Sequence, residues 1–163
     1  MRAAAVSPGR ARLAGRVSPP RAGRASAALH DGRPRVPREW SEQRIRESQA
    51  LFERRGVGIW LAYERSTDEL VGFCGFLHLP SWPEPQLMYA MPARFGGRGF
   101  ATEMARASIA HARTRPGLAE IVADVDEINV ASVRVLEKLG FARVAVQAGA
   151  FGNLLLLRLP AGR

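Results

Sequence analysis

The sequence holds little of the material that several classes of protein need. Its 163 residues include one cysteine, Cys74, which excludes an intrachain disulfide and a cysteine-rich metal site. The three histidines lack the spacing of metal ligands, so we expect no bound metal. The longest purely apolar runs, residues 59–63 and 87–91, are far too short to cross a bilayer, and the first residues lack the apolar stretch of a secretory signal. These absences predict a soluble, cytoplasmic protein that does not act in a membrane.

Acidic residues are scarce at the start of the chain and balance the basic ones elsewhere. The formal net charge is +9, but residues 1–38 hold nine Arg against Asp31 alone. Residues 39–163 hold fourteen Arg and Lys138 against fourteen acids, so their net charge is only +1. A nucleic-acid-binding module would therefore have to rest on the basic tail, and the near-neutral remainder argues against it.

The chain divides into a tail and one domain. Residues 1–37 mix Arg, Ala, Pro, Gly and Ser without a helical or strand period, and their like charges repel one another. We expect a disordered tail there, or an artefact of a misassigned start codon. Residues 38–163 have the length and the apolar content of a single domain with its own core.

The spacing of apolar residues within this domain alternates between helical and strand periods. Gly56 and Gly140 each follow a helical pattern, as helix-ending glycines do, and Asn129 precedes one as an N-cap. The predicted class is an α/β domain of about six strands. Its elements are a helix from Trp40 to Gly56, an antiparallel pair of strands at 57–64 and 70–79, a strand at 86–91, a helix from about 100 to 116, a strand at 121–125, a helix after Asn129, and a final antiparallel pair at 141–146 and 151–159 across a turn at 147–150.

The most informative segment is RFGGRGFATE, residues 94–103, which joins the strand at 86–91 to a helix. Three glycines in four positions let backbone N–H groups converge on an anion, and the helix start adds about half a positive charge. The segment therefore predicts a phosphate or diphosphate site. A dinucleotide-binding fold is disfavoured, because Thr102 stands where that fold needs a small residue and the hairpin at 57–79 breaks its repeated strand-helix-strand units.

A second segment, NVASVRVLEKLGF at residues 129–141, follows one strand after the glycine turn. Together the two segments resemble the GNAT superfamily of acetyl-CoA-dependent N-acetyltransferases, in particular the branch that includes ribosomal-protein N-terminal acetyltransferases. The resemblance spans about residues 38–160. It implies a mixed, mostly antiparallel sheet flanked by helices, here lacking the family's first strand and helix, because residues 1–37 show no pattern able to supply them.

The resemblance also implies how acetyl-CoA would bind as cosubstrate. The family pattern R/Q-x-x-G-x-G/A holds the coenzyme A diphosphate, and the strand at 86–91 splays from the strand at 121–125 to leave backbone groups free for pantetheine. The residues of this sequence that fill the coenzyme-binding positions are Tyr89, Met91, Arg94, Gly97, Arg98, Gly99, Phe100, Ala101 and Asn129.

Three side chains are candidates for the chemistry of acetyl transfer. A carboxylate must accept the proton of the amine, and Glu84 is the nearest one to the strand at 86–91. Gln86 stands where related enzymes often have Glu; it can hold a water or orient the substrate, but it cannot titrate. Many relatives protonate the leaving thiolate with a Tyr at the position of Leu136, and the branch resembled here uses a Ser in N-x-x-S, which makes Ser132 the candidate proton donor.

The acceptor that these residues imply is a small primary amine or a protein N-terminus. Two alternatives stay open at this point: a catalytically impaired relative that binds coenzyme A, suggested by Gln86, Leu136 and the absent opening elements, and the nucleic-acid-binding module. A strand edge left exposed by the absent first strand would favour a homodimer.

Overall fold

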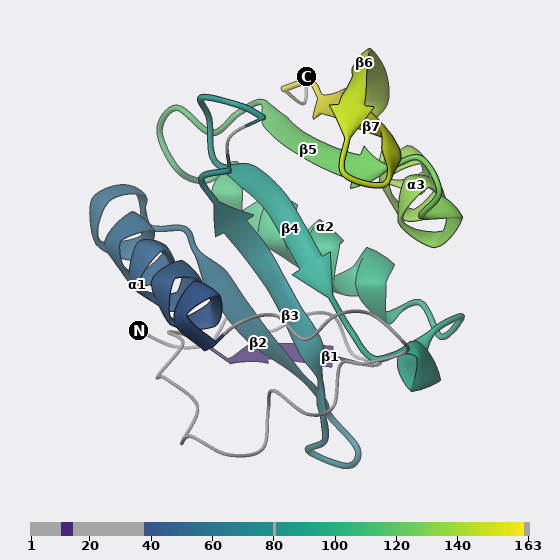
Figure 1. Cartoon of the computed structure of the whole chain (residues 1–163). Helices are drawn as coiled ribbons and strands as arrows, with labels where there is room; N and C mark the ends of the chain where they lie inside the picture. Colours follow the sequence, from purple (N-terminus) through teal and green to yellow (C-terminus); the bar gives the residue numbers. More distant parts are fainter. Residues whose placement is uncertain (1–10, 15–37, 80, 162–163) are drawn as a thin grey trace.

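The computed structural model of the chain describes residues 11–14, 38–79 and 81–161, and its centre is a seven-stranded sheet with the strand order β1-β2-β3-β4-β5-β7-β6 (Figure 1). Figure 1 shows helix α1 in front of this sheet and helix α2 behind it. This is the mixed, mostly antiparallel sheet flanked by helices that the sequence predicts. The elements are β1 (Ala11–Ala14), α1 (Arg38–Arg55), β2 (Ile59–Glu64), β3 (Leu70–Leu77), β4 (Gln86–Ala90), the 3-10 turn η2 (Ala93–Phe95), α2 (Phe100–Ala112), β5 (Ile121–Asp126), α3 (Val130–Lys138), β6 (Ala142–Gly149) and β7 (Gly152–Leu159).

The expectation that the first strand is absent is wrong. β1 pairs antiparallel with β2, from Ala11 opposite Glu64 to Ala14 opposite Leu61. A four-residue edge strand is held by backbone hydrogen bonds to its neighbour, so it needs no apolar period that a sequence pattern could reveal. The predicted disorder of residues 1–37 otherwise lies outside the described residues.

Local sequence explains where the other elements end. Gly56 ends α1 with φ of +69°, and Gly140 follows α3 with φ of +91°, both in the left-handed region that glycine tolerates. The final hairpin differs from the prediction of a turn at 147–150. Its connection is Ala150 and Phe151 alone, because β6 continues to Gly149, which pairs directly with Gly152.

The sheet opens between β4 and β5. These two parallel strands pair at Gln86 and Val122 only, whereas β5 pairs with β7 over all six of its residues. The predicted splay is therefore confirmed: beyond Gln86 the two strands diverge toward their carboxyl ends, and their facing backbone edges are not joined to each other.

Small side chains bring α2 close to the sheet behind this opening. Ala105, Ser108 and Ala112 are fully buried, and the Ser108 hydroxyl lies 3.3 Å from the sulfur of Cys74 on β3. The side chains of Leu87 and Tyr89 on β4 and of Ile121 and Ala123 on β5 belong to the same packed core. The opened part of the sheet consequently has one face turned toward α2 and the other turned away from it.

Candidate functional site

The glycine turn forms an open cradle of backbone donors after β4. Gly97 and Gly99 have φ of +71° and +84°, and Gly99 is the N-cap of α2 without any side-chain cap. The first hydrogen bond at the start of α2 runs from the Glu103 N–H to the Gly99 carbonyl at 3.0 Å. The amides of Phe100 and Ala101 precede that bond, as the first amides of any helix do, and point along its axis. They form a site at which an anion also meets the positive end of the helix dipole.

Space is available in front of this cradle. A Cβ atom built on Gly97 meets no atom within 4 Å, whereas a Cβ on Gly72 of β3 would lie 2.2 Å from the Ala90 carbonyl oxygen. The cradle floor is rigid, because Phe95 and Phe100 are buried and their rings meet edge to face with centroids 5.8 Å apart. The cradle can therefore admit a group that a side chain at Gly97 would exclude.

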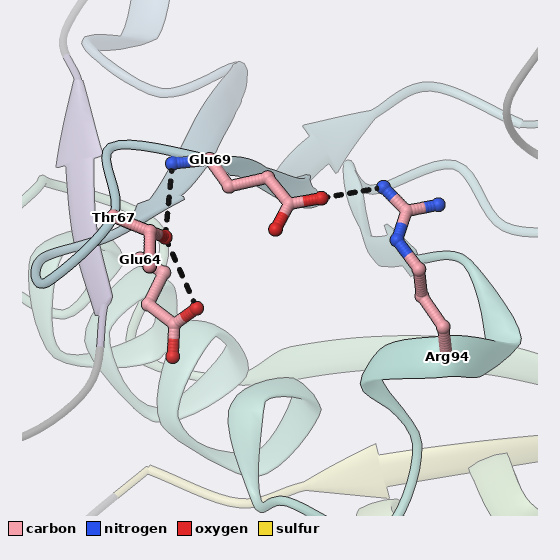
Figure 2. A network of polar contacts seen from close by, with 4 residues as sticks. All are labelled: Glu64, Thr67, Glu69 and Arg94. Atoms are coloured by element: carbon pink, nitrogen blue, oxygen red, sulfur yellow. Dashed lines mark hydrogen bonds and ion pairs between the residues drawn. The ribbon is translucent and has the colours of Figure 1, made fainter.

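The two arginines of the turn are held by carboxylates of the β2–β3 hairpin. Arg94 Nη2 donates to Glu69 Oε1 at 2.9 Å, and Arg98 Nη2 donates to Glu64 Oε1 at 2.5 Å. Figure 2 shows the first of these pairs, with Thr67 between the two hairpin carboxylates: its hydroxyl donates to Glu64 and accepts from the Glu69 N–H. These carboxylates offset the positive charge of the arginine side chains, so the main-chain donors are the stronger feature of the cradle.

The structure brings Tyr89, Asn129 and Ser132 together beside the opening between β4 and β5. The Tyr89 hydroxyl donates to the Ser132 carbonyl at 3.2 Å, and the Ser132 N–H donates to Asn129 Oδ1 at 3.3 Å. Asn129 is thus the N-cap of α3 that the sequence predicts. Burial raises the pKa of Tyr89 to about 12, so its hydroxyl stays protonated and remains a donor at neutral pH.

The two residues predicted near the start of β4 have different surroundings. Glu84 is exposed in the loop before the strand. Gln86 is fully buried; its Nε2 donates to the Leu79 carbonyl at 3.0 Å, and its Oε1 accepts from the Ser81 hydroxyl at 3.2 Å. Gln86 therefore anchors the loop that precedes β4, while Glu84 is not part of that hydrogen-bonded group. Met91 lies just beyond β4, partly buried against the core.

Sequence reasoning missed Ser81 and Asp124. The Ser81 hydroxyl also contacts Asp124 Oδ2, and this contact joins the loop to β5 across the opening. The one available signal was a carboxylate inside a buried apolar strand, because Asp124 stands between Ala123 and Val125. Nothing local indicates its partner, which lies 43 residues earlier in the chain.

Two classes of site find no support in the described part of the chain. Residues 11–14, 38–79 and 81–161 contain no group of three or more His, Cys, Asp and Glu side chains arranged for a metal ion. None of the helices within these residues combines the length and apolar character needed to cross a membrane. The features that are present are an anion cradle at a helix start, an opened sheet beside it, and polar side chains next to that opening, among them the hydroxyl of Tyr89 and the carboxylate of Asp124.

Comparison with known proteins agrees with this arrangement. The sequence model of the acetyltransferase (GNAT) domain matches residues 20–142. The protein YkkB of Bacillus subtilis, whose function is uncharacterised, is 31% identical over 108 residues, which cover 65% of this chain and 60% of YkkB. The matched region thus spans less than two thirds of that relative.

Solved structures share the fold at lower sequence identity. An acetyltransferase from Agrobacterium tumefaciens superposes with a TM-score of 0.74 at 21% identity, covering 98% of this chain and 92% of that one. RimL, a ribosomal alpha-N-protein acetyltransferase in complex with coenzyme A, superposes with a TM-score of 0.62 at 18% identity, covering 78% of this chain and 75% of that one. At these identities the likeness concerns the fold.

Proposed function

Because the chain belongs to the GNAT acetyltransferase family, we propose that it transfers the acetyl group of acetyl-CoA to a primary amine. The observation that carries the proposal is the position of the anion cradle directly beside the opened sheet. The diphosphate of coenzyme A needs convergent donors, and its pantetheine arm needs unpaired backbone to bond with. The cradle at residues 97–101 and the diverging edges of β4 and β5 offer these two things next to each other.

The residues around the opening suit the proton transfers of this reaction. Acetyl-CoA supplies the acetyl group as a thioester, and the departing thiolate must gain a proton. Ser132 is the proposed donor, because it lies at the start of α3 with its carbonyl bonded to Tyr89 from β4. Backbone N–H groups of β4 around residues 87–89 are proposed to stabilise the oxyanion, a contribution worth about 3 kcal/mol per donor in other acyl-transfer sites.

The acceptor is proposed to be a small primary amine or the α-amine of a protein. The protein N-terminus finds support in the printed name of RimL, although its identity to this chain is only 18%. An α-amine has a pKa of about 8, so much of it is protonated at neutral pH and requires a proton acceptor in the site.

The test is an assay of the full chain with acetyl-CoA and a panel of primary amines and short peptides with free N-termini. Release of free thiol is followed together with the thermal unfolding midpoint. We expect thiol release that depends on an amine, and an unfolding midpoint that rises with coenzyme A concentration. A raised midpoint without thiol release would instead favour an impaired relative that only binds the coenzyme. The nucleic-acid-binding alternative would be favoured if both responses were absent and the full chain bound DNA with an affinity that falls steeply as salt is raised.

A matched pair of glycine variants tests the cradle itself. Gly97→Ala and Gly117→Ala both place a Cβ on a residue with φ near +70°, at +71° and +72°, so their backbone strain is similar. Gly117 follows the opposite end of α2, where its Cβ would meet only the Arg55 guanidinium at 3.2 Å. We expect the Gly97 variant alone to lose the coenzyme-dependent rise in the unfolding midpoint. An equal loss in both variants, or in neither, would contradict diphosphate binding at the cradle.

A further inference from the structure

The Ser81 hydroxyl lies between two acceptors but has only one proton to donate. Gln86 Nε2 donates to the Leu79 carbonyl, which turns Gln86 Oε1 toward Ser81, and Asp124 Oδ2 contacts the same hydroxyl from the other side. When Asp124 is ionised, Ser81 can donate to Gln86 or to Asp124, but not to both. When Asp124 carries a proton, it can donate to Ser81, and Ser81 can then donate to Gln86. Both contacts become hydrogen bonds only when Asp124 holds a proton.

The surrounding contacts restrain these three side chains. Gln86 is fully buried at the one point where β4 and β5 pair. Ser81 is held through its neighbour Trp82, whose ring lies under the Arg158 guanidinium at 5.2 Å. Arg158 in turn pairs with Glu120 at 2.9 Å. The loop therefore keeps the Ser81 hydroxyl in place while a proton enters or leaves Asp124.

The location of Asp124 suits an amine that approaches the opened sheet. Ile121, Ala123 and Val125 of β5 belong to the core that α2 covers, so Asp124 is directed to the opposite face by strand alternation. Gln86 likewise alternates with Leu87, which faces the core. Asp124 lies two residues beyond the Gln86–Val122 pairing, where the strands have begun to diverge, and it remains partly exposed. Phe100 at the start of α2 and Leu136 of α3 belong to the same core as these β5 residues, so the two faces of the sheet offer separate approaches to the opening.

We propose that Asp124 is the catalytic proton acceptor for the amine, with Ser81 and Gln86 as its positioning residues. This inference rests on the proposed acetyl transfer. Asp124 takes one proton from the ammonium group and later releases it to water. The freed nitrogen lone pair forms the N–C bond to the acetyl carbon as the C–S bond breaks. The second proton that the nitrogen gives up balances the one that the thiolate gains, so one proton is released per acetyl group transferred.

The experiment compares Asp124→Asn with Asp126→Asn in the full chain. Asp126 lies on the same face of the same strand two residues further on, so it controls for the charge change. Asparagine at 124 can donate to Ser81 as a protonated Asp does, which protects the fold. At pH 7 we expect the Asp124 variant to lose roughly 10²–10⁴-fold in kcat, with its coenzyme-dependent unfolding midpoint unchanged, and the Asp126 variant to keep its kcat. Ser81 positions Asp124 but does not itself take up the proton. We therefore expect Ser81→Ala to lose only about tenfold in kcat, less than removal of the acid–base group itself causes.

The pH dependence separates a catalytic role from a structural one. Above the α-amine pKa of about 8, the amine substrate is already deprotonated in solution. The kcat deficit of the Asp124 variant with such a substrate should therefore shrink as pH rises. A deficit that stays constant with pH, an unchanged kcat, or an equal deficit in the Asp126 variant would overturn the role of Asp124 while leaving the acetyltransferase proposal standing. Absence of turnover in the unmodified chain would overturn both.

Discussion

At the residue scale, the surroundings of each side chain beside the opening decide which proton it can handle. Tyr89 is buried, and its phenol is committed to the Ser132 carbonyl as a donor. The Ser132 N–H donates to the side chain of Asn129, which is the N-cap of α3, so the Ser132 hydroxyl is not required for the helix cap. Tyr89 therefore positions the first turn of α3, and Ser132 is the better candidate for the proton that the thiolate takes up.

Ser132→Ala is expected to lower kcat by tenfold or more while leaving coenzyme affinity almost unchanged, because it removes a proton donor that acts only during the reaction. Steady-state kinetics and the coenzyme-dependent unfolding midpoint measure the two quantities separately. Tyr89→Phe is the comparison variant, since it keeps the Ser132 hydroxyl and removes only the bond to its carbonyl. Unchanged kcat in the Ser132 variant would remove its proposed role.

Cys74 should make the fold sensitive to alkali. Burial raises the pKa of Cys74 from 9.0 to about 12, so the folded protein keeps a proton that the unfolded chain loses. The contribution of this thiol to stability is fully present below about pH 9 and is lost as pH rises toward 12, because the unfolded state then binds fewer protons. Cys74→Ala should therefore show a shallower fall in the free energy of unfolding above pH 9, by up to about 1 kcal/mol per pH unit. Denaturant titrations between about pH 8 and 10 measure the slope, and parallel slopes in the two proteins would contradict the assignment.

The sequence predicts those features of the candidate site that the local backbone sets. The positive φ of Gly97 and Gly99 and the N-cap at Asn129 are confirmed, because each is a property of a few consecutive residues. Coenzyme binding by these residues stays a prediction. Proximity in sequence to β4 favours Glu84 as the catalytic carboxylate, and that residue is exposed in a loop. The proton acceptor proposed in its place, Asp124, depends on a contact with Ser81 that only the folded sheet creates.

At the element scale, a buried hydroxyl on α1 is hydrogen-bonded to the start of β2. Ser48 is 1% exposed, and its Oγ accepts from the Ile59 N–H at 2.8 Å, where β2 begins. Helix ends and hairpins were predictable because glycines and short polar turns mark them in the sequence. This junction was not, since a serine on a helix face is usually solvated and its partner lies on another element.

Ser48→Ala should lower the free energy of unfolding by about 1–3 kcal/mol, because it leaves the Ile59 N–H without its acceptor. Thermal or denaturant unfolding measures the loss. Ser66→Ala makes the same chemical change at an exposed position of the β2–β3 turn and should stay within about 0.5 kcal/mol of the parent. Equal effects of the two variants would show that the buried bond is unimportant.

At the scale of the whole molecule, the edges of the sheet decide how copies of the chain could meet. The homodimer predicted from the sequence rested on an exposed edge of β2, and β1 covers that edge. The opposite edge is β6, which is exposed along its length and carries Val144 and Val146 at 50% and 47% exposure. The homodimer remains a prediction, and β6 is the edge from which it would form.

The pairing of β1 makes residues 11–14 part of the folded unit, and a deletion tests this. Removal of residues 1–37 takes away the backbone partners of residues 61–64 and turns β2 into an open edge. We expect the shortened chain to unfold several degrees lower and to associate more strongly than the parent, as measured by thermal unfolding and sedimentation velocity.

Removal of residues 1–10 is the control, because it leaves β1 intact. Identical unfolding midpoints and association for the two truncated chains would mean that β1 contributes nothing to the sheet, and the sequence-based boundary at residue 38 would then describe the folded unit correctly.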